Sequence, residues 1–226
     1  MAKKAKAKKR STDAKQNSRI KKLESLVLKT IENKQVNYFS NSNSISSSGL
    51  EVGSFLSTST GAEDGTNLGD PARIGNSITL MNQRFNMNIT ASATDTYNQI
   101  RVLLVESLDG NAPIALNDVL QYGSYTLYGS LVFASPYTTK TNTNRRYKVH
   151  YDKSFVLSGL PTKGGVPPAK VIKHNIKYKN GKVIEYEGAG NVNPTNHRIT
   201  MLLISDSVSA SHPQLDYSTR STYKDA

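Results

Sequence analysis

The amino-terminal 22 residues carry most of the charge of this 226-residue chain. Ten of them are basic and one, Asp13, is acidic, which is a net +9 out of the +12 of the whole chain. The positive charges within such a block repel one another, and binding of a polyanion would neutralise them. Lys and Arg bind phosphate groups by displacing counterions, without reading bases. The sequence predicts a nucleic-acid-binding segment formed by Lys3, Lys4, Lys6, Lys8, Lys9, Arg10, Lys15, Arg19, Lys21 and Lys22.

A short basic run is also typical of a nuclear localisation signal or of a solubility tail. These interpretations are compatible with nucleic-acid binding, because each needs only an exposed cationic segment. The charge pattern alone leaves the three open.

Residues that could do catalytic chemistry are few and scattered. The four histidines, His150, His174, His197 and His212, match no metal-binding motif in their spacing. No G-x-S-x-G nucleophile motif and no P-loop occurs. The absence of cysteine excludes disulfides and Cys-containing zinc sites. We expect a protein that is not an enzyme and that requires no cofactor.

Length and hydropathy narrow the class of protein. A chain of this length holds one substantial domain with an appendage, or two small domains. No run of 18 apolar residues occurs, so we expect no membrane helix and no membrane partner. The basic N-terminus lacks the unbroken apolar stretch that follows in a secretory signal.

An amphipathic helix is predicted at about residues 18–33. Ile20, Leu23, Val27 and Ile31 recur at helical spacing, and Ser18 is suited to cap the N-terminus. About four turns with a narrow apolar stripe are marginal in isolation, so the helix needs a partner. That partner is the body of the protein, another copy of the helix, or nucleic acid.

Composition divides the chain into three parts. Residues 1–34 form a basic arm that includes the helix, with a net charge of +9. Residues 35–72 are rich in Ser and Asn and predict a linker and surface arm. Residues 73–226 show short β-patterned runs and predict the main domain.

One of these runs predicts a long strand with a bulge. The apolar residues Ile78 and Leu80 lie at even-numbered positions, whereas Phe85, Met87 and Ile89 lie at odd-numbered positions, so the parity of the apolar positions changes between the two groups. An extra residue between the two groups returns all five side chains to one face.

Other segments predict further elements. Residues 100–107 are apolar at both even-numbered and odd-numbered positions, as in a central strand covered on both faces. Residues 197–205 predict another strand. In a strand near residue 150, Tyr147, Val149 and Tyr151 are expected on one face. Residues 113–122 predict a short helix.

The segment from residue 170 to 188 predicts a β-hairpin. A two-residue turn would place apolar side chains opposite polar ones. A three-residue loop at 179–181, with Gly181 left-handed at a bulge, pairs Ile176 with Ile184 instead. We therefore expect the bulged hairpin.

These elements predict an all-β fold, namely a single jelly-roll β-sandwich of about eight antiparallel strands with a basic N-terminal arm containing a short helix. An immunoglobulin-type sandwich is the alternative, but its characteristic Cys and Trp residues are absent.

The order of several motifs resembles one protein family. The basic arm, the helix ending in IENK, GDPARIG, IRVLLVES, PIALNDVL, RRYKVHYDKSFVLSG, RITMLLISDS and the terminal YKDA follow one another along the chain. Together they resemble the small capsid proteins of the satellite tobacco necrosis virus type, which also occur in circular single-stranded DNA viruses. The chain departs from that pattern in longer loops at 50–68 and 160–168.

The resemblance implies a capsid protein that assembles into an icosahedral T=1 shell of about 60 copies. The arms would point inward and package a single-stranded genome, either RNA or DNA. The protein would reside in the virion, and in the host cytoplasm or nucleus during assembly. The host receptor is left open.

The resemblance also implies a structural calcium ion between subunits. The residues at the matching positions are the carboxylates Glu32 and Asp225 and the backbone carbonyls of Leu68 and Pro71. Calcium prefers such oxygen ligands. A solvated acid at a helix end and a frayed terminus are the alternatives for Glu32 and Asp225.

Two other classes of protein stay open at this point. One is a cellular nucleic-acid-binding β-protein with a basic tail, of ribosomal or chromatin type. The other is a carbohydrate-binding sandwich whose tail directs it to the nucleus.

Overall fold

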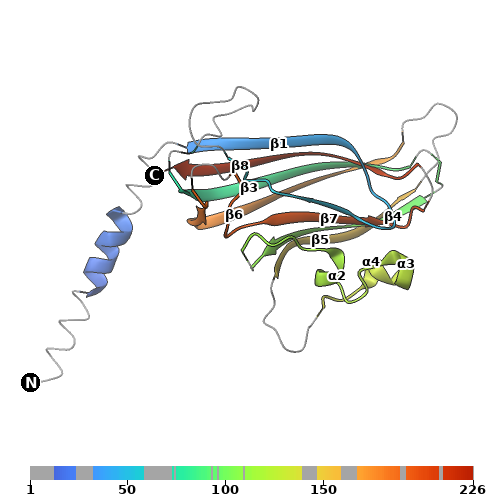
Figure 1. Ribbon diagram of the computed structural model, residues 1–226, viewed down its shortest axis with the longest axis horizontal. Helices are drawn as coiled ribbons and strands as arrows, with labels where there is room; N and C mark the ends of the chain where they lie inside the picture. Colours follow the sequence, from blue (N-terminus) through green and yellow to red (C-terminus); the bar gives the residue numbers. More distant parts are fainter. Residues whose placement is uncertain are drawn as a thin grey trace, which may run out of the picture.

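The computed structural model describes residues 13–23, 33–58, 73, 75–92, 94–95, 97–108, 110–138, 147–158, 167–188, 192–208 and 211–225. The body is a sandwich of two four-stranded sheets, which we name sheet A and sheet B (Figure 1). Sheet A has the order β1 (Asn33–Ser44), β8 (Gln214–Asp225), β3 (Ser77–Thr90) and β6 (Ala169–Glu185). Sheet B has the order β2 (Leu50–Gly53), β7 (Ile199–Ser205), β4 (Tyr97–Ser107) and β5 (Tyr147–Ser158).

The strand order is that of a jelly roll. Neighbouring strands are antiparallel throughout both sheets. Successive strands alternate between the sheets, except that β4 and β5 are neighbours in sheet B. The last strand, β8, lies between β1 and β3. The predicted all-β single jelly roll is therefore confirmed.

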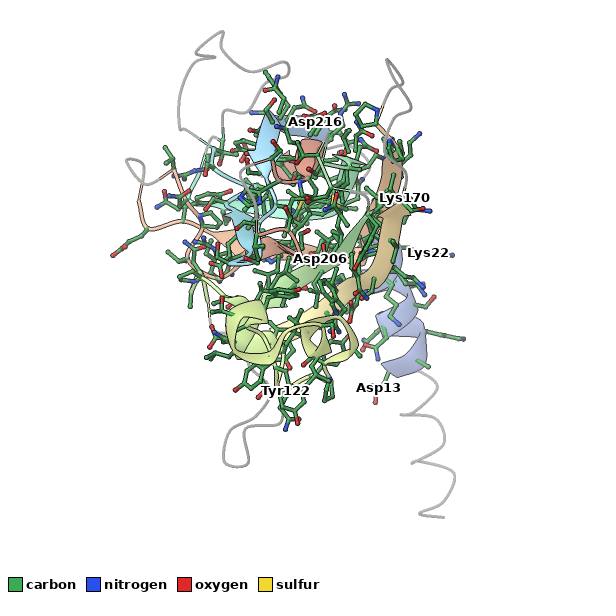
Figure 2. The ribbon with its side chains drawn as sticks, turned by 90° about the vertical axis from the view of Figure 1, so that its right-hand side faces the viewer. Asp13, Lys22, Tyr122, Lys170, Asp206 and Asp216 are labelled. Atoms are coloured by element: carbon green, nitrogen blue, oxygen red, sulfur yellow. The ribbon has the colours of Figure 1, made fainter. Side chains whose placement is uncertain are left out.

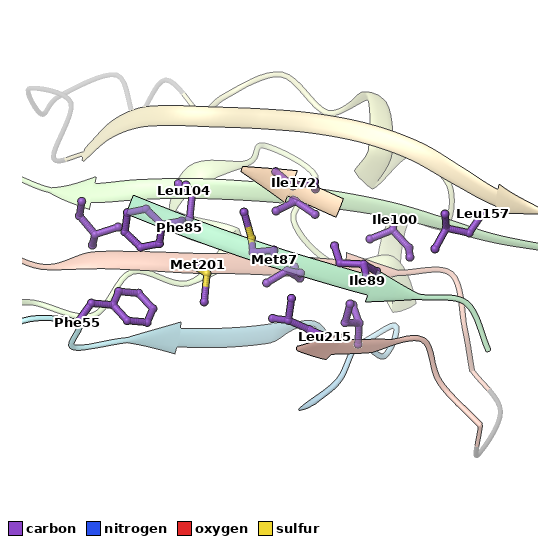
Figure 3. Close-up of a cluster of buried hydrophobic side chains, with 14 of the residues drawn as sticks. Phe55, Phe85, Met87, Ile89, Ile100, Leu104, Leu157, Ile172, Met201 and Leu215 are labelled. Carbon is purple, nitrogen blue, oxygen red and sulfur yellow. The ribbon is translucent and has the colours of Figure 1, made fainter. Parts of the chain in front are cut away.

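One apolar cluster fills the space between the sheets (Figure 3). Phe85, Met87 and Ile89 of β3 face Leu104 of β4, and all four side chains are fully buried. Phe55 packs edge-on against Phe85, with ring centroids 5.4 Å apart. Burial of each such side chain stabilises the fold by about 1.5–3 kcal/mol.

The predicted bulge in β3 lies at Met81. Relative to β8, β3 has one extra residue there, because Leu80 pairs with Tyr223 and the next pair skips Met81. Ile78 and Leu80 pack with Tyr223 in a second cluster at one end of the sandwich, while Phe85 belongs to the main core. The change of parity in the sequence thus marks the bulge correctly.

β4 is buried on both faces, as its apolar run predicted. Val102 and Leu104 face the core between the sheets, whereas Leu103 and Val105 face an outer cluster. Three short helices cover that outer face: α2 (Leu116–Val119), α3 (Tyr125–Tyr128) and α4 (Leu131–Ala134) (Figure 1). α2 lies within the segment predicted to be helical, whereas α3 and α4 were not predicted. β7 also lies where a strand was expected.

Arg101 of β4 holds the helical segment against sheet B. Its guanidinium donates to both carboxylate oxygens of Asp152, at 3.0 and 2.8 Å. The same group donates to the carbonyl oxygens of Val132 and Ser135, at 2.7 and 3.0 Å. Tyr137 donates its hydroxyl to Asp152 at 2.8 Å. A buried charge of this kind is tolerated because all its partners are in place.

The expected linker at residues 35–72 is wrong in its first part. β1 and β2 lie there, and the jelly roll begins at Asn33 rather than Arg73. Val36 and Ile45 are buried in the core despite their polar neighbours. The Ser- and Asn-rich composition hid these strands, because few of their residues face inward. β8 was not predicted, for the same reason.

The expected hairpin between residues 170 and 188 is also wrong. Ala169–Glu185 form one strand, β6, which pairs with β3 on both sides of an irregularity. Residues 178–181 bulge out opposite Met81, and Gly181 has the left-handed φ of +75° that the sequence predicted. Gly181 therefore serves a bulge within a strand rather than the end of a hairpin.

A bulge also corrects the alternation expected in β5. His150 is an extra residue relative to β4, since Leu104 pairs with Tyr151 and Val105 with Val149. Val149 packs in the outer cluster, whereas Tyr151 packs against the core between the sheets. The two side chains are therefore not on one face.

The helix in the arm begins earlier than expected. Residues 13–23 are helical, so Ser18 lies inside the helix and is not its N-cap. Residues 13–17 contain no large apolar side chain, so the apolar periodicity could not reveal them. The remainder of the expected helix, residues 24–32, lies outside the described part of the chain.

We predict that Gly181→Ala destabilises the unassembled subunit by about 2–4 kcal/mol. An added Cβ would overlap the side chain of Thr79 and would sit on a backbone of positive φ. Gly188 has a similar φ of +77° and open space around its Cα, so Gly188→Ala should cost only about 1 kcal/mol. Urea unfolding of both variants measures the difference, and equal losses would contradict the packing role of the bulge.

Candidate nucleic-acid interface

Four of the ten predicted nucleic-acid-binding residues lie in the helix at 13–23. All four, Lys15, Arg19, Lys21 and Lys22, are exposed. Lys15, Arg19 and Lys22 are spaced i, i+4 and i+7, so they form one stripe along the helix. Figure 2 shows Asp13 and Lys22 near the two ends of this helix. Such a stripe can follow a phosphate backbone.

The other six predicted residues lie outside the described part of the chain. They are Lys3, Lys4, Lys6, Lys8, Lys9 and Arg10.

The helix also presents apolar side chains to solvent. Ile20 is 51% exposed and Leu23 is 61% exposed. Every residue of the segment 13–23 is exposed, so its stripe of apolar side chains has no cover from the described residues of one subunit. The described residues supply no partner for this helix, whose marginal stability calls for one.

Asp225 is the one candidate calcium ligand within the described residues. Its side chain is nearly fully buried, and its Oδ2 accepts a hydrogen bond from Lys34 Nζ at 3.2 Å. Lys34 stands at the start of β1, where Asn33 pairs with Lys224 of β8. This ion pair joins the start of β1 to the end of β8 within one subunit.

Glu32, Leu68 and Pro71, the other three predicted ligands, lie outside the described residues. Within the described part of the chain, no three His, Asp or Glu side chains gather as a metal site would require. A carboxylate such as Asp225 suits calcium, but the ammonium group of Lys34 already offsets its charge.

A buried ionic cluster that the sequence did not predict joins the two sheets. Glu106 of β4 lies 2.6 Å from His150 Nε2 and accepts a hydrogen bond from Lys182 of β6. Lys182 Nζ also donates to His197 Nδ1 at 3.0 Å. Because an ammonium group only donates, the His197 ring accepts at Nδ1 and donates from Nε2 to Gln83 at 3.1 Å.

These contacts shift the titration of the cluster. Burial alone would raise the pKa of the Glu106 carboxyl, but the hydrogen bonds that it accepts from His150 and Lys182, together with the charge of Lys182, hold this pKa well below its ordinary value of 4.5. Burial lowers the pKa of His197 below 6.5, and the charge of Lys182 lowers it further. The cluster therefore combines a charged carboxylate with a neutral imidazole at neutral pH.

The ionic cluster around Glu106 could not be predicted from the sequence, because the fold brings its residues together from distant segments. Glu106, His150, Lys182 and His197 come from four separate segments, and the bulge at Gly181 directs Lys182 inward, on the same face as Leu80. One signal was available: a carboxylate inside an otherwise apolar run requires a buried partner. The four histidines have structural contacts. The His174 ring, for example, packs at a tilt of 58° against Tyr151, with ring centroids 5.3 Å apart.

Membership of a protein family follows from comparison with known sequences. The model of the family described as satellite tobacco necrosis virus coat protein matches residues 1–226. The chain belongs to this family. It is therefore a viral coat protein, a structural component of the virion and not an enzyme. The cellular and carbohydrate-binding alternatives are thereby excluded.

Two solved structures align with the chain at low sequence identity. The capsid structure of Desmodium yellow mottle tymovirus aligns with a TM-score of 0.41 and 10% identity, over 86% of this chain and 88% of that chain. The native virion of Kashmir bee virus at acidic pH aligns with a TM-score of 0.28 and 8% identity, over 86% of this chain and 68% of that one. No curated protein sequence matches the coat protein. Among its described residues, no helix is long and apolar enough to cross a membrane.

We predict that Glu106→Gln destabilises the coat protein subunit by about 3 kcal/mol at pH 7, because Lys182 loses its buried counter-charge. The carboxyl pKa is lowered on folding, so its contribution is present above about pH 4.5 and is lost as the pH falls below that value. The difference from wild type should therefore shrink between about pH 5 and pH 3.

Urea unfolding at a series of pH values checks this prediction, with Glu51→Gln on the exposed side of β2 as the control. A loss that is equal at pH 3 and pH 7 would contradict the ionic role of Glu106.

Proposed function

We propose that the coat protein assembles into an icosahedral shell of about 60 copies, which closes because point-group symmetry repeats one set of contacts. The basic arms point inward and package a single-stranded genome, RNA or DNA. Assembly takes place in the host cytoplasm or nucleus.

The exposed basic stripe on the arm helix carries this proposal. Lys15, Arg19 and Lys22 lie on one side of a helix that no described residue of the body covers. The segment 1–34 holds +9 of the net charge, which leaves +3 for the remaining 192 residues. Such an asymmetry suits a body that forms the shell and an arm that binds phosphate.

The charge of the arms is adequate for packaging. About 60 arms of +9 bring roughly 540 positive charges into one particle, enough to offset a large part of a genome on the order of a thousand nucleotides. Confinement within one shell makes weak single contacts multivalent.

The exposed apolar side chains of the arm point to a second role. Ile20 and Leu23 would be covered if arm helices of neighbouring copies pack together at a symmetry axis. Neutralisation of the basic stripe by the genome would lower the repulsion between such helices. Packaging and shell assembly are then coupled.

Calcium would strengthen the contacts between copies. Asp225 would bind it together with Glu32 and the carbonyl groups of Leu68 and Pro71. Hard divalent cations favour such oxygen donors, and one carboxylate of the set is already buried beside the start of β1. A bound ion would tie the arm to the C-terminal strand.

We predict that Lys15→Gln, Arg19→Gln and Lys22→Gln together lower the nucleic-acid content of purified particles. Because the variant can no longer neutralise three phosphates, the slope of log binding constant against log salt should fall by about 2. A matched control replaces Lys148, Lys153 and Lys179, three exposed lysines of the body, by Gln. Deletion of residues 1–22 should leave the jelly roll folded and the particles empty.

The ratio of absorbance at 260 and 280 nm measures the packaged nucleic acid, and circular dichroism measures the fold. Genome content at the wild-type level in the arm variants would overturn packaging through the arm.

For calcium, we predict that a chelator lowers the melting temperature of particles and that added calcium restores it. Asp225→Asn should abolish this response, whereas Glu51→Gln should preserve it. The variant loses its ion pair with Lys34 in any case, so the response to calcium decides, and not the melting temperature itself. Wild-type particles that do not respond to either addition would show that the shell holds no structural calcium.

A further inference from the structure

The outward face of sheet A carries an uncovered group of cations. Arg84 of β3, Arg220 of β8, and Lys173 and Lys177 of β6 are all exposed. They share one face, because the alternate residues Phe85, Ile172 and Ile176 are buried between the sheets. We name Arg84, Lys173, Lys177 and Arg220 the basic face of sheet A.

Register brings two of these cations together. Arg84 and Arg220 are direct partners across the antiparallel pair of β3 and β8. Directly opposed residues lie only about 5 Å apart, and like charges in such a pair repel each other. Among the described residues, no carboxylate lies within ion-pair distance of any member of the basic face. This arrangement favours a bound polyanion.

The neighbouring rows of the same face suit a nucleic acid. Lys173 pairs with Asn86, which donates to Ser218 at 3.4 Å, and Ser218 pairs with Phe39 of β1. Phe39 is 77% exposed, although it lies in a regular strand. An exposed aromatic ring on a sheet, with cations and amides in the rows beside it, offers stacking for a base and contacts for phosphates.

Acidic groups on this face are few. Asp216 lies two rows from Arg220 along β8, and its Oδ1 accepts the backbone amide of Ser42 at 2.9 Å. Figure 2 shows Asp216 on the side of the sandwich opposite Tyr122, which marks the helical segment over sheet B. Helices cover sheet B, whereas exposure of the basic face shows that no described element covers sheet A.

We propose that the basic face of sheet A is a second binding surface for single-stranded nucleic acid, on which Phe39 stacks against a base. This inference rests on the proposed packaging function. It extends genome contact from the arm to the folded body. Sheet A would then be the side of the body that faces the interior of the shell.

The test measures binding of full-length, unassembled coat protein to a fluorescent single-stranded oligonucleotide of about 15 nucleotides across a range of salt. Arg84→Gln with Arg220→Gln should lower the slope of log binding constant against log salt by about 1.4, or about 0.7 for each phosphate contact. The control, Lys148→Gln with Lys153→Gln on sheet B, removes the same charge and should leave the slope unchanged.

Phe39 is tested separately, because stacking does not depend on counterions. Phe39→Ala should weaken binding about tenfold at every salt concentration, with an unchanged slope, and Phe39→Trp should retain the affinity. Lys173→Gln with Lys177→Gln, on the edge strand, is a second charge variant should the arginine variant fail to fold.

The outcomes separate this inference from the function of the arm. Loss of slope in the sheet A variants supports the basic face even if the arm variants bind normally. Wild-type slope and affinity in all the sheet A variants, with arm variants impaired, overturns the basic face alone. Normal binding with failure of the particles to assemble would show that sheet A contacts another subunit instead, and would also overturn it.

Discussion

The fold depends on the placement of its last strand. β8 lies between β1 and β3, so sheet A is complete only when the C-terminal segment joins the N-terminal strand. Backbone hydrogen bonds along both neighbours and the buried Tyr223 hold β8 there. The same placement sets Asp225 beside Lys34, where the arm enters the body, and Arg220 beside Arg84. Non-local pairing of this kind is slow to form, because its loop-closure entropy must be overcome first.

The two faces of the sandwich have different surroundings. The outer face of sheet B is covered by α2, α3 and α4, which Arg101 and Asp152 hold in place. The outer face of sheet A is open and cationic. Between them, Glu106 and Lys182 link the sheets through a partly buried ion pair, which adds a polar contact to the apolar packing of the core. If the basic face of sheet A binds nucleic acid as proposed, this difference between the faces would orient the subunit in the shell.

Strands with inward-facing apolar runs were predictable from the sequence, and strands with few such residues were not. The change of parity at Met81 and the two-sided burial of β4 follow from local patterns. β1 and β8 consist largely of Ser, Asn, Thr and charged residues. β8 pairs with β3 and β1 pairs with β8, and this pairing sustains the two strands rather than local propensity. The charged residues could likewise be predicted only where the pattern is local in the sequence. The charge of the arm is local, whereas the Glu106 cluster and the pair of Arg84 and Arg220 join residues far apart in the chain.

Cryo-electron microscopy of purified particles with their nucleic acid tests the central claim most directly. The account predicts closed particles of uniform size, with the arms and the basic face of sheet A toward the interior and nucleic-acid density against Phe39 and Arg220. Particles in which sheet A faces outward, or in which the interior density avoids both the arms and sheet A, would contradict it.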